Sequence, residues 1–424
     1  MFIPVVLKLI VSLLVIILIN RVSKNLPLSL LSGSLSFALW IGLSYEEILV
    51  TAYQRIMNFN TGGLMLLVGL VIILSMMMKE TGLIEELVST IRGSFSARTS
   101  VAVLPAMIGL LPMPGGALFS APLLDHFDDI SGIDPNMKTR INYWFRHVWE
   151  YAWPLYPGII VACDVAGIEL WQIFFLGIPL SISSIFIGYF YYLSRIAQDQ
   201  KGYPLKRDSL NIRPFIPVIT VVISYVVIQV FFPMIPKANQ YLPMIIGLVI
   251  AVSSLQFRKP LSMDTWGKIM TSKNLYKMMV IILMVRIYGA FIDVSIDGVP
   301  LVGLMTQEMQ QLGVPSLPLI MLIPFLAGIT MGVSVGFAGS ALPVVIALLG
   351  PDPSFGLLAG TLVFSYVCGF MGTMLSPLHV CMIVTCEYYK TGLSASFRAV
   401  IIPAIILASI AFIYMQVLIQ LFPN

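Results

Sequence analysis

The stretches PMPGGALFSAPLL, at residues 112–124, and GVSVGFAGSALPVV, at residues 332–345, interrupt long apolar runs with glycine, proline and serine. These residues disrupt a helix, and broken backbone at membrane depth is tolerated only where protein or a water-filled cavity surrounds it. We therefore expect the segments that contain them, 100–124 and 316–349, to form re-entrant helical hairpins rather than simple membrane spans.

The composition is that of a membrane protein. Of the 424 residues, 58% are hydrophobic and only 10% are charged, whereas soluble domains contain about 25% charged residues. The mean hydropathy of +0.95 likewise excludes a soluble globular protein. Apolar runs close to the length of about 20 residues that crosses a bilayer recur along the whole chain. Ten spans are predicted, at residues 2–20, 26–43, 61–78, 138–166, 168–195, 214–232, 241–257, 275–293, 355–388 and 394–421.

The order of these segments repeats once. Residues 1–195 contain five predicted spans around the hairpin 100–124, residues 214–424 contain five more around the hairpin 316–349, and the polar stretch 196–213 links the two copies. Because each copy crosses the membrane an odd number of times, the second copy enters upside down relative to the first. The predicted fold is an all-α polytopic membrane protein of about ten transmembrane helices in two inverted repeats.

The positions of the basic residues predict the orientation. If residue 1 is placed on one side of the membrane, nearly all loop Lys and Arg residues fall on the other side, and only Arg55 and Lys237 fall on the first. By the positive-inside rule the linker 196–213 is cytoplasmic, and both termini lie outside the cytoplasm of a cell that carries the protein in its inner membrane. The first hairpin then enters from the cytoplasmic side and the second from the outer side.

Three stretches carry a resemblance to a known family. MPGGALFSAP, the following NYWFRHVWEYAWPLYPG and the later SVGFAGSALP resemble an uncharacterised family of predicted integral membrane proteins within the ion transporter superfamily. That superfamily includes gluconate, citrate and C4-dicarboxylate carriers, arsenite permeases and some sodium/proton antiporters. The resemblance covers most of the chain and implies a homodimer with a scaffold and a mobile transport domain, in which two hairpins and two broken helices surround the substrate. This sequence lacks a clean Ser-Asn-Thr at either hairpin tip, so the substrate of the dicarboxylate carriers is not carried over.

The first hairpin offers candidate substrate-binding residues. Pro114, Gly115 and Gly116 break the helix, and Ser120 lies where it restarts. Backbone N–H groups exposed at such a break could bind an anion. The alternative is a glycine-kinked helix that packs closely against its neighbour.

The second hairpin offers hydroxyl and carbonyl groups. Ser334, Gly339 and Ser340 are candidates for substrate binding, and Thr330 is a candidate for ion coupling. Small residues at this spacing are also what ordinary helix–helix contact requires, so close packing is the alternative here as well.

The span that follows the first hairpin is the most polar. Ionisable groups inside a membrane are functional candidates by default, and we assign Asn142 and Arg146 to substrate binding and His147 and Glu150 to ion coupling. Arg146 and Glu150 are expected on one face of a continuous helix, where they could pair. The alternative is an ion pair that only holds the fold.

The matching span of the second copy is interrupted at GFMGTMLSPLHV, residues 369–380. Pro377 is the breaker, Thr373 and Ser376 are candidate substrate-binding residues, and His379 is a candidate for ion coupling. A lone histidine in a helix is more often a packing group than a proton carrier. Its place in the matching broken span favours the functional interpretation.

Cofactor chemistry is not expected. The four cysteines, Cys163, Cys368, Cys381 and Cys386, lack metal-type spacing and are predicted to be free thiols. No metal site, catalytic group or cofactor is predicted, apart from Na⁺ or H⁺ as the coupling ion. Arg286 is interpreted as a counter-charge for Asp293 or as a structural anchor.

These features favour a secondary active transporter of a small, anionic organic solute, coupled to sodium or protons by alternating access. A sodium/proton antiporter or another inorganic ion permease is the alternative. A channel would not need two matched interrupted halves, and the motifs of an intramembrane enzyme are missing, so we expect no enzyme. The expected partners are a small-molecule or ion substrate, the lipid bilayer and a second copy of the chain; no nucleic acid is expected.

Overall fold

The computed structural model describes residues 3–94, 97–111, 116–125, 133–194, 196, 211, 213–296, 298–313 and 315–423. These residues are almost entirely helical; the strands among them are β1 (Ser295–Ile296) and β2 (Val299–Pro300), which pair antiparallel. Seven helical segments of the described chain are long and apolar enough to cross a membrane: Val5–Ser23, Phe59–Glu80, Leu170–Leu193, Arg213–Phe231, Met263–Ile292, Phe355–Met374 and Leu393–Leu421. The chain is an all-α polytopic membrane protein, as the composition predicts.

The first half of the chain contains the following helices: α1 (Val5–Ser23), α2 (Leu26–Trp40), α3 (Tyr45–Ile56), α4 (Phe59–Glu80), α5 (Leu83–Ser94), α6 (Ala97–Gly109), α7 (Ala117–Asp125), α9 (Pro135–Arg146), α10 (Pro157–Ala166), α11 (Leu170–Gly188) and the π-helical turn η1 (Tyr189–Leu193). Short polar side chains fix several of the starts. Asn25 accepts a hydrogen bond from the Leu28 N–H at the start of α2, and Asp134 accepts from the N–H groups of Asn136 and Met137 at the start of α9.

The second half contains the following helices: the 3₁₀ turn η2 (Arg213–Phe215), α12 (Ile216–Phe231), α13 (Met234–Ala238), α14 (Leu242–Arg258), α15 (Met263–Met270), α16 (Lys273–Ile292), α17 (Leu301–Leu312), α18 (Ser316–Met331), α19 (Ser334–Ser340), α20 (Leu342–Ala347), α21 (Phe355–Met374), α22 (Val380–Tyr389) and α23 (Leu393–Leu421). The predicted hairpins correspond to α6 with α7 and to α18 with α19 and α20. The tip of the first, residues 112–115, and nearly all of the linker 196–213 lie outside the described residues.

Two predicted spans are each divided into two helices. The span 138–166 consists of α9 and α10, with residues 147–156 between them, and the span 355–388 consists of α21 and α22, with residues 375–379 between them. Proline explains both breaks, because its ring clashes with the carbonyl group four residues earlier and it donates no hydrogen bond. Pro154 and Pro157 act in the first break, and Pro377 acts in the second.

The first break corrects one prediction. Arg146 and Glu150 do not lie on one face of a continuous helix, because α9 ends at Arg146 and residues 147–152 form turns. The spacing of four residues carries that meaning only while the helix continues.

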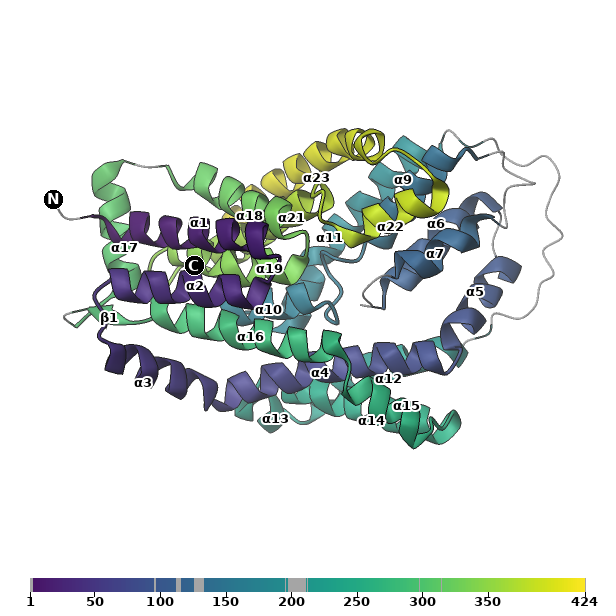
Figure 1. Cartoon of the computed structure of the whole chain (residues 1–424), viewed down its shortest axis with the longest axis horizontal. Coiled ribbons are helices and arrows are strands. Elements are labelled where there is room, and N and C mark those ends of the chain that lie inside the picture. Colours follow the sequence, from purple (N-terminus) through teal and green to yellow (C-terminus); the bar gives the residue numbers. More distant parts are fainter. Residues whose placement is uncertain are drawn as a thin grey trace.

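The hairpins approach the middle of the molecule from opposite ends of its long axis (Figure 1). The pair α6 and α7 lies at the right-hand end beside α9 and α22, whereas α18 begins toward the left-hand end and runs inward; α10 and α19 lie in the middle. Glycine allows close packing between α18 and α21. A Cβ added at Gly328 would overlap the carbonyl oxygen of Gly369, so the two backbones are in direct contact.

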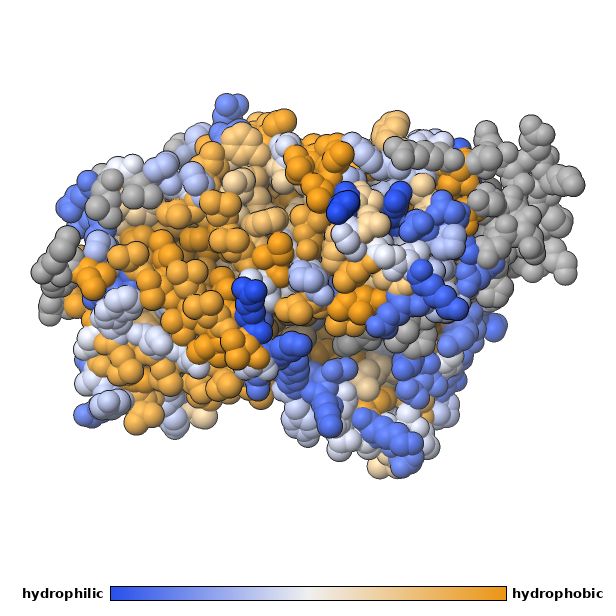
Figure 2. All heavy atoms as spheres, turned by 45° about the horizontal axis from the view of Figure 1, so that its top comes forward, coloured by the Kyte–Doolittle hydropathy of each residue, from blue (hydrophilic) through white to orange (hydrophobic). Residues whose placement is uncertain are grey.

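The surface agrees with a membrane location. The face shown in Figure 2 carries a broad continuous hydrophobic area, and its hydrophilic side chains gather mainly toward the right-hand part. Large apolar side chains such as Leu18, Phe175, Phe186 and Ile413 are more than half exposed. In water such exposure would be costly, whereas in a bilayer these side chains contact lipid.

Candidate functional site

The two helix breaks meet at a pair of buried histidines. His147, the first residue after α9, and His379, the residue before α22, are 3% and 8% exposed. Their Nε2 atoms lie 3.2 Å apart, although the residues are 232 positions apart in the sequence. The structure therefore joins the broken spans of the two halves at their interruptions.

Each histidine is held in place by a backbone carbonyl. His147 Nδ1 lies 2.6 Å from the carbonyl oxygen of Tyr143, and His379 Nδ1 lies 2.9 Å from that of Gly332. The Tyr143 ring contacts both imidazoles edge-on, and its hydroxyl donates to the Met374 carbonyl at 2.7 Å. Since Gly332 joins α18 to α19, the second hairpin takes part in orienting the pair.

The second hairpin contacts both breaks. Ser376 Oγ, in the second break, donates to the Ile329 carbonyl of α18 at 2.6 Å. At the first break, a Cβ added at Gly158 would lie 2.7 Å from Ser334 Oγ and 2.9 Å from the Tyr366 hydroxyl. Glycine at position 158 thus lets α10 approach the start of α19 closely.

The first hairpin contacts Arg146. A Cβ added at Gly116 would overlap the Arg146 guanidinium, and one added at Gly109 would overlap the Arg146 carbonyl oxygen. The hydroxyl of Tyr156, in the first break, donates to the Gly109 carbonyl. Both described sides of this hairpin therefore lie against the break that follows α9.

Two further candidates of the polar span are buried. Asn142 donates from Nδ2 to Thr385 Oγ1 of α22 at 3.1 Å, which joins the two broken spans again. Glu150 is 8% exposed, and its Oε2 atom has no hydrogen-bond partner among the described residues, Arg146 included. An oxygen in that state costs free energy unless a ligand or ion satisfies it.

Several predicted residues form contacts within their own helix or hairpin or with a neighbouring helix. The hydroxyls of four donate to carbonyls of their own helix or hairpin: Ser120, Thr330, Ser340 and Thr373. Gly339 lies against Val285 of α16, which is the close-packing alternative. Pro114 and Gly115 lie outside the described residues.

One residue of the centre was missed. All four cysteines are free, but Cys381 lies beside the histidine pair, and its Sγ and the ligand nitrogens of His147 and His379 are all within 4.8 Å of one another. The spacing between cysteines could not reveal this group, because its second and third members are histidines. The sequence signal that was available is the short spacing of His379 and Cys381.

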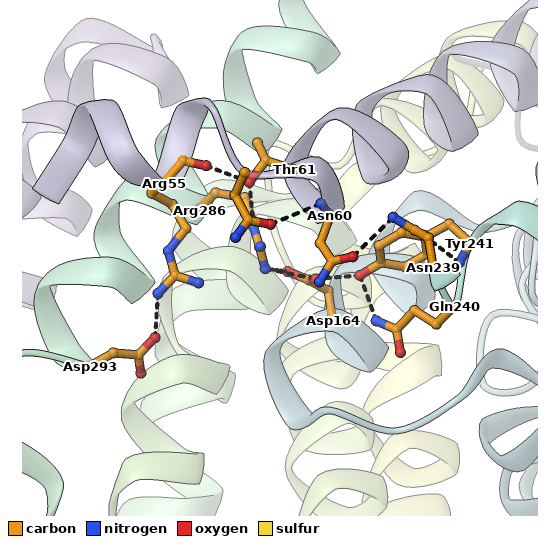
Figure 3. A network of polar contacts seen from close by, with 10 residues as sticks. Arg55, Asn60, Thr61, Asp164, Asn239, Gln240, Tyr241, Arg286 and Asp293 are labelled. Carbon is orange, nitrogen blue, oxygen red and sulfur yellow. Dashed lines mark hydrogen bonds and ion pairs between the residues drawn. The ribbon is translucent and has the colours of Figure 1, made fainter. Parts of the chain in front are cut away.

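A second polar cluster contains a buried ion pair whose carboxylate oxygens are both bonded (Figure 3). Arg286 of α16 donates from Nη1 to both carboxylate oxygens of Asp164 at 2.8 Å and from Nε to Thr61 Oγ1 at 3.1 Å. The Tyr241 hydroxyl donates to the same carboxylate. Asp293 pairs with Arg55 at 2.6 Å, so Arg286 is the counter-charge of Asp164 and not of Asp293.

The structure is that of a polytopic helical membrane protein. Two broken helices meet at their interruptions around buried ionisable groups, and a helical hairpin packs on each side. The family model described as "Protein of unknown function (DUF401)" matches residues 6–418, so the chain belongs to this family. This confirms the predicted membership in an uncharacterised family of membrane proteins.

The fold is shared with a solved transporter structure. The chain is similar to the YdaH transporter of Alcanivorax borkumensis, with a TM-score of 0.58 and 14% sequence identity, over 89% of this chain and 90% of that one. No curated protein sequence matches the chain. At this identity the likeness establishes the common fold.

Proposed function

We propose that this protein is a secondary active transporter of a small, anionic organic solute, coupled to Na⁺ or H⁺. The observation that carries the proposal is the meeting of both helix breaks and the second hairpin at buried ionisable groups, where His147 and His379 are in contact. Irregular backbone and charge inside a membrane are both costly, and proteins retain them where a solute or ion binds. The fold shared with a protein described as a transporter supports the same conclusion.

The residues divide into two roles. Arg146, with its guanidinium against the first hairpin, supplies the positive charge for an anion, and Asn142, Ser334 and Ser376 line the same breaks. Glu150 and the histidine pair are assigned to the coupling ion, because the Glu150 Oε2 atom is buried without a hydrogen bond among the described residues.

The transport cycle is alternating access by two inverted repeats, residues 1–195 and 214–424, in a homodimer in the cell membrane. Hairpins that approach from opposite ends of the molecule support this arrangement (Figure 1). Each hairpin would open the site toward one side of the membrane in turn.

Exchange of an inorganic cation for protons is the second candidate. The buried Glu150 carboxylate favours it, because a cation could satisfy the oxygen that lacks a hydrogen bond. Cation-driven pH changes in vesicles without any organic anion would favour this candidate over the first.

The function is tested by binding and then by flux. Purified protein is screened for thermal stabilisation by organic anions with and without Na⁺ and at several pH values, since a ligand of the folded state raises apparent stability. Anions that stabilise are tested for uptake into proteoliposomes under a Na⁺ or a proton gradient. Saturable uptake that follows one gradient is expected, and uptake that is linear in solute and independent of both gradients contradicts the proposal.

The orientation is tested by labelling. A Ser209→Cys variant, in a background in which the four native cysteines are replaced by serine, is treated with an impermeant thiol reagent. We expect reaction in inside-out vesicles but not in intact cells, because the linker 196–213 is assigned to the cytoplasm. Labelling in intact cells would contradict both the orientation and the inverted repeats.

A further inference from the structure

The two histidines at the helix breaks point the same ring atom, Nε2, toward each other. A carbonyl oxygen only accepts hydrogen bonds, so the Nδ1 atoms that lie 2.6 and 2.9 Å from the carbonyls of Tyr143 and Gly332 carry the ring protons and donate them. In the neutral rings both Nε2 atoms are then acceptors, yet they lie 3.2 Å apart and are buried. Two lone pairs held together in this way repel each other, and a positive species between them would relieve that repulsion.

The third member of the group is a thiol. Cys381 Sγ lies within 4.8 Å of both imidazole ligand atoms, and Cys381 is partly exposed. Two imidazole nitrogens and one thiolate are the donors that borderline and soft transition metals prefer, whereas Na⁺, Mg²⁺ and Ca²⁺ prefer oxygen.

We propose that His147, His379 and Cys381 bind a single transition-metal ion of the Zn²⁺ and Cu⁺ class. The proposal goes beyond the proposed transport of an anion, and it does not depend on it. The ion ties the break after α9 to the break before α22, and it uses the Nε2 atoms of the two histidines and the thiolate of the cysteine.

The distances suit such an ion. With metal–nitrogen bonds of about 2.0–2.1 Å, the nitrogens of a tetrahedral site lie about 3.3 Å apart, against 3.2 Å here. A sulfur at about 2.3 Å from the metal lies about 3.6 Å from each nitrogen, so the Cys381 side chain, now within 4.8 Å of them, needs to move by only a little over about 1 Å.

The surroundings match those of a metal ligand as well. Metal-binding histidines almost always donate their other ring N–H to a carbonyl, carboxylate or water, which fixes the tautomer and makes the ligand more basic. Both histidines do so here, and the partners Tyr143 and Gly332 belong to different halves of the chain. One thiolate fully neutralises a Cu⁺ ion and half neutralises a Zn²⁺ ion, which lowers the cost of a charge inside the membrane.

Cobalt provides the test, because Co²⁺ replaces Zn²⁺ in such sites and a cobalt–thiolate bond absorbs in the near ultraviolet. Purified full-length protein is titrated with Co²⁺, and one ion per chain with a thiolate absorption band is expected. Zn²⁺ should displace it, and a separate titration with Cu⁺ shows which of the two ions is held more tightly. The thiolate band should vanish in Cys381→Ser, and binding should weaken by about tenfold or more in His379→Gln. Cys386→Ser is the matched control, since Cys386 is a buried thiol on the same helix that bonds to Ser396 instead.

A second measurement uses the wild-type chain, so that misfolding of a variant cannot decide the result. Alkylation of Cys381 by a maleimide, followed by mass spectrometry, should be slowed at least about tenfold by Zn²⁺ and not by Mg²⁺. A wild-type protein that binds neither Co²⁺ nor Cu⁺, a thiolate band that survives in Cys381→Ser, or alkylation that neither Zn²⁺ nor Cu⁺ slows each overturns the proposal. The first of these results would assign a shared proton to the histidine pair.

Discussion

Two buried polar clusters lie in the membrane domain, and they differ in how completely their hydrogen bonds are made. In the first, Arg286 and Asp164 face each other with side chains that are 11% and 5% exposed, and both carboxylate oxygens are bonded. In the second, at the helix breaks, Glu150 Oε2 has no hydrogen-bond partner among the described residues. The Nε2 atoms of the two histidines are adjacent there, and in the neutral rings neither of them carries a proton.

The difference separates structure from function. A cluster in which every group is bonded can hold the fold and has nothing left to offer a ligand. A buried group without a bond costs free energy, and it is retained where a ligand, ion or conformational change uses it. By this criterion α16 and α10 are joined by a structural link, and the helix breaks form the site.

The largest expected effect tests the structural link. Asp164→Asn keeps the shape of the side chain but leaves the Arg286 guanidinium buried without a counter-charge, which should lower the free energy of unfolding by about 3–5 kcal/mol. Denaturant unfolding of the purified protein in detergent measures it. Replacing the whole pair, Asp164→Leu with Arg286→Met, should recover most of the loss, because apolar replacement of a complete buried pair is often tolerated. A loss below about 1 kcal/mol for Asp164→Asn would mean that this ion pair does little to stabilise the fold, and it would contradict its assignment as a structural link.

The sequence predicted the membrane class and the positions of the seven segments that are long and apolar enough to cross a membrane, because hydropathy over about 20 residues is a local property. Both breaks were also predictable from Pro154, Pro157 and Pro377, since proline acts on its own helix.

The partners of charged residues were not predictable. Arg286 was considered with Asp293, seven residues away, but it pairs with Asp164, which is 122 residues away. Arg146 and Glu150 were considered on one helix, but the helix ends between them. Cys381 was missed for the same reason, because only the packing of two helix breaks brings it to the histidines.

The next effect tests whether Arg146 has a fixed position. In Gly116→Ala the added methyl group would overlap the Arg146 guanidinium, the end of a flexible side chain that can move aside. We expect a loss of about 1–3 kcal/mol in unfolding free energy, as is usual for overpacking, together with weaker anion binding in the thermal-shift assay. The control is Gly109→Ala, whose methyl group would meet the Arg146 carbonyl oxygen, which cannot move without the backbone. If the control costs no more stability than Gly116→Ala, the contact of Arg146 with the first hairpin is not as close as the structure shows.

A smaller change in stability is expected at Glu150, although the chemical change is the same as in Asp164→Asn. Glu150→Gln replaces a buried carboxyl group whose Oε2 has no hydrogen-bond partner among the described residues with an amide of the same shape, so the unfolding free energy should change by about 1 kcal/mol or less. Solute uptake should nevertheless fall by about tenfold or more, because a neutral amide cannot carry a proton and offers a cation no negative charge. Normal uptake by the folded variant would remove Glu150 from the site. The double variant Arg146→Met with Glu150→Leu extends the test, since normal uptake there would leave the hairpin backbone as the main candidate.

The smallest effect is expected for Arg55 and Asp293, which form an ion pair of the same chemistry at 2.6 Å, but with side chains that are 25% and 62% exposed. Water screens such a pair and solvates either partner when the other is removed, so the expected loss in Arg55→Gln is only about 0.2–1 kcal/mol. Uptake should be unchanged, because these residues belong to the bonded cluster (Figure 3) and not to the group around His147 and His379. The loss should shrink further in 1 M salt, where surface charges are screened within about 3 Å. A loss as large as that of Asp164→Asn would mean that burial does not set the strength of these two pairs, and the contrast between bonded and unbonded clusters would then need another physical basis.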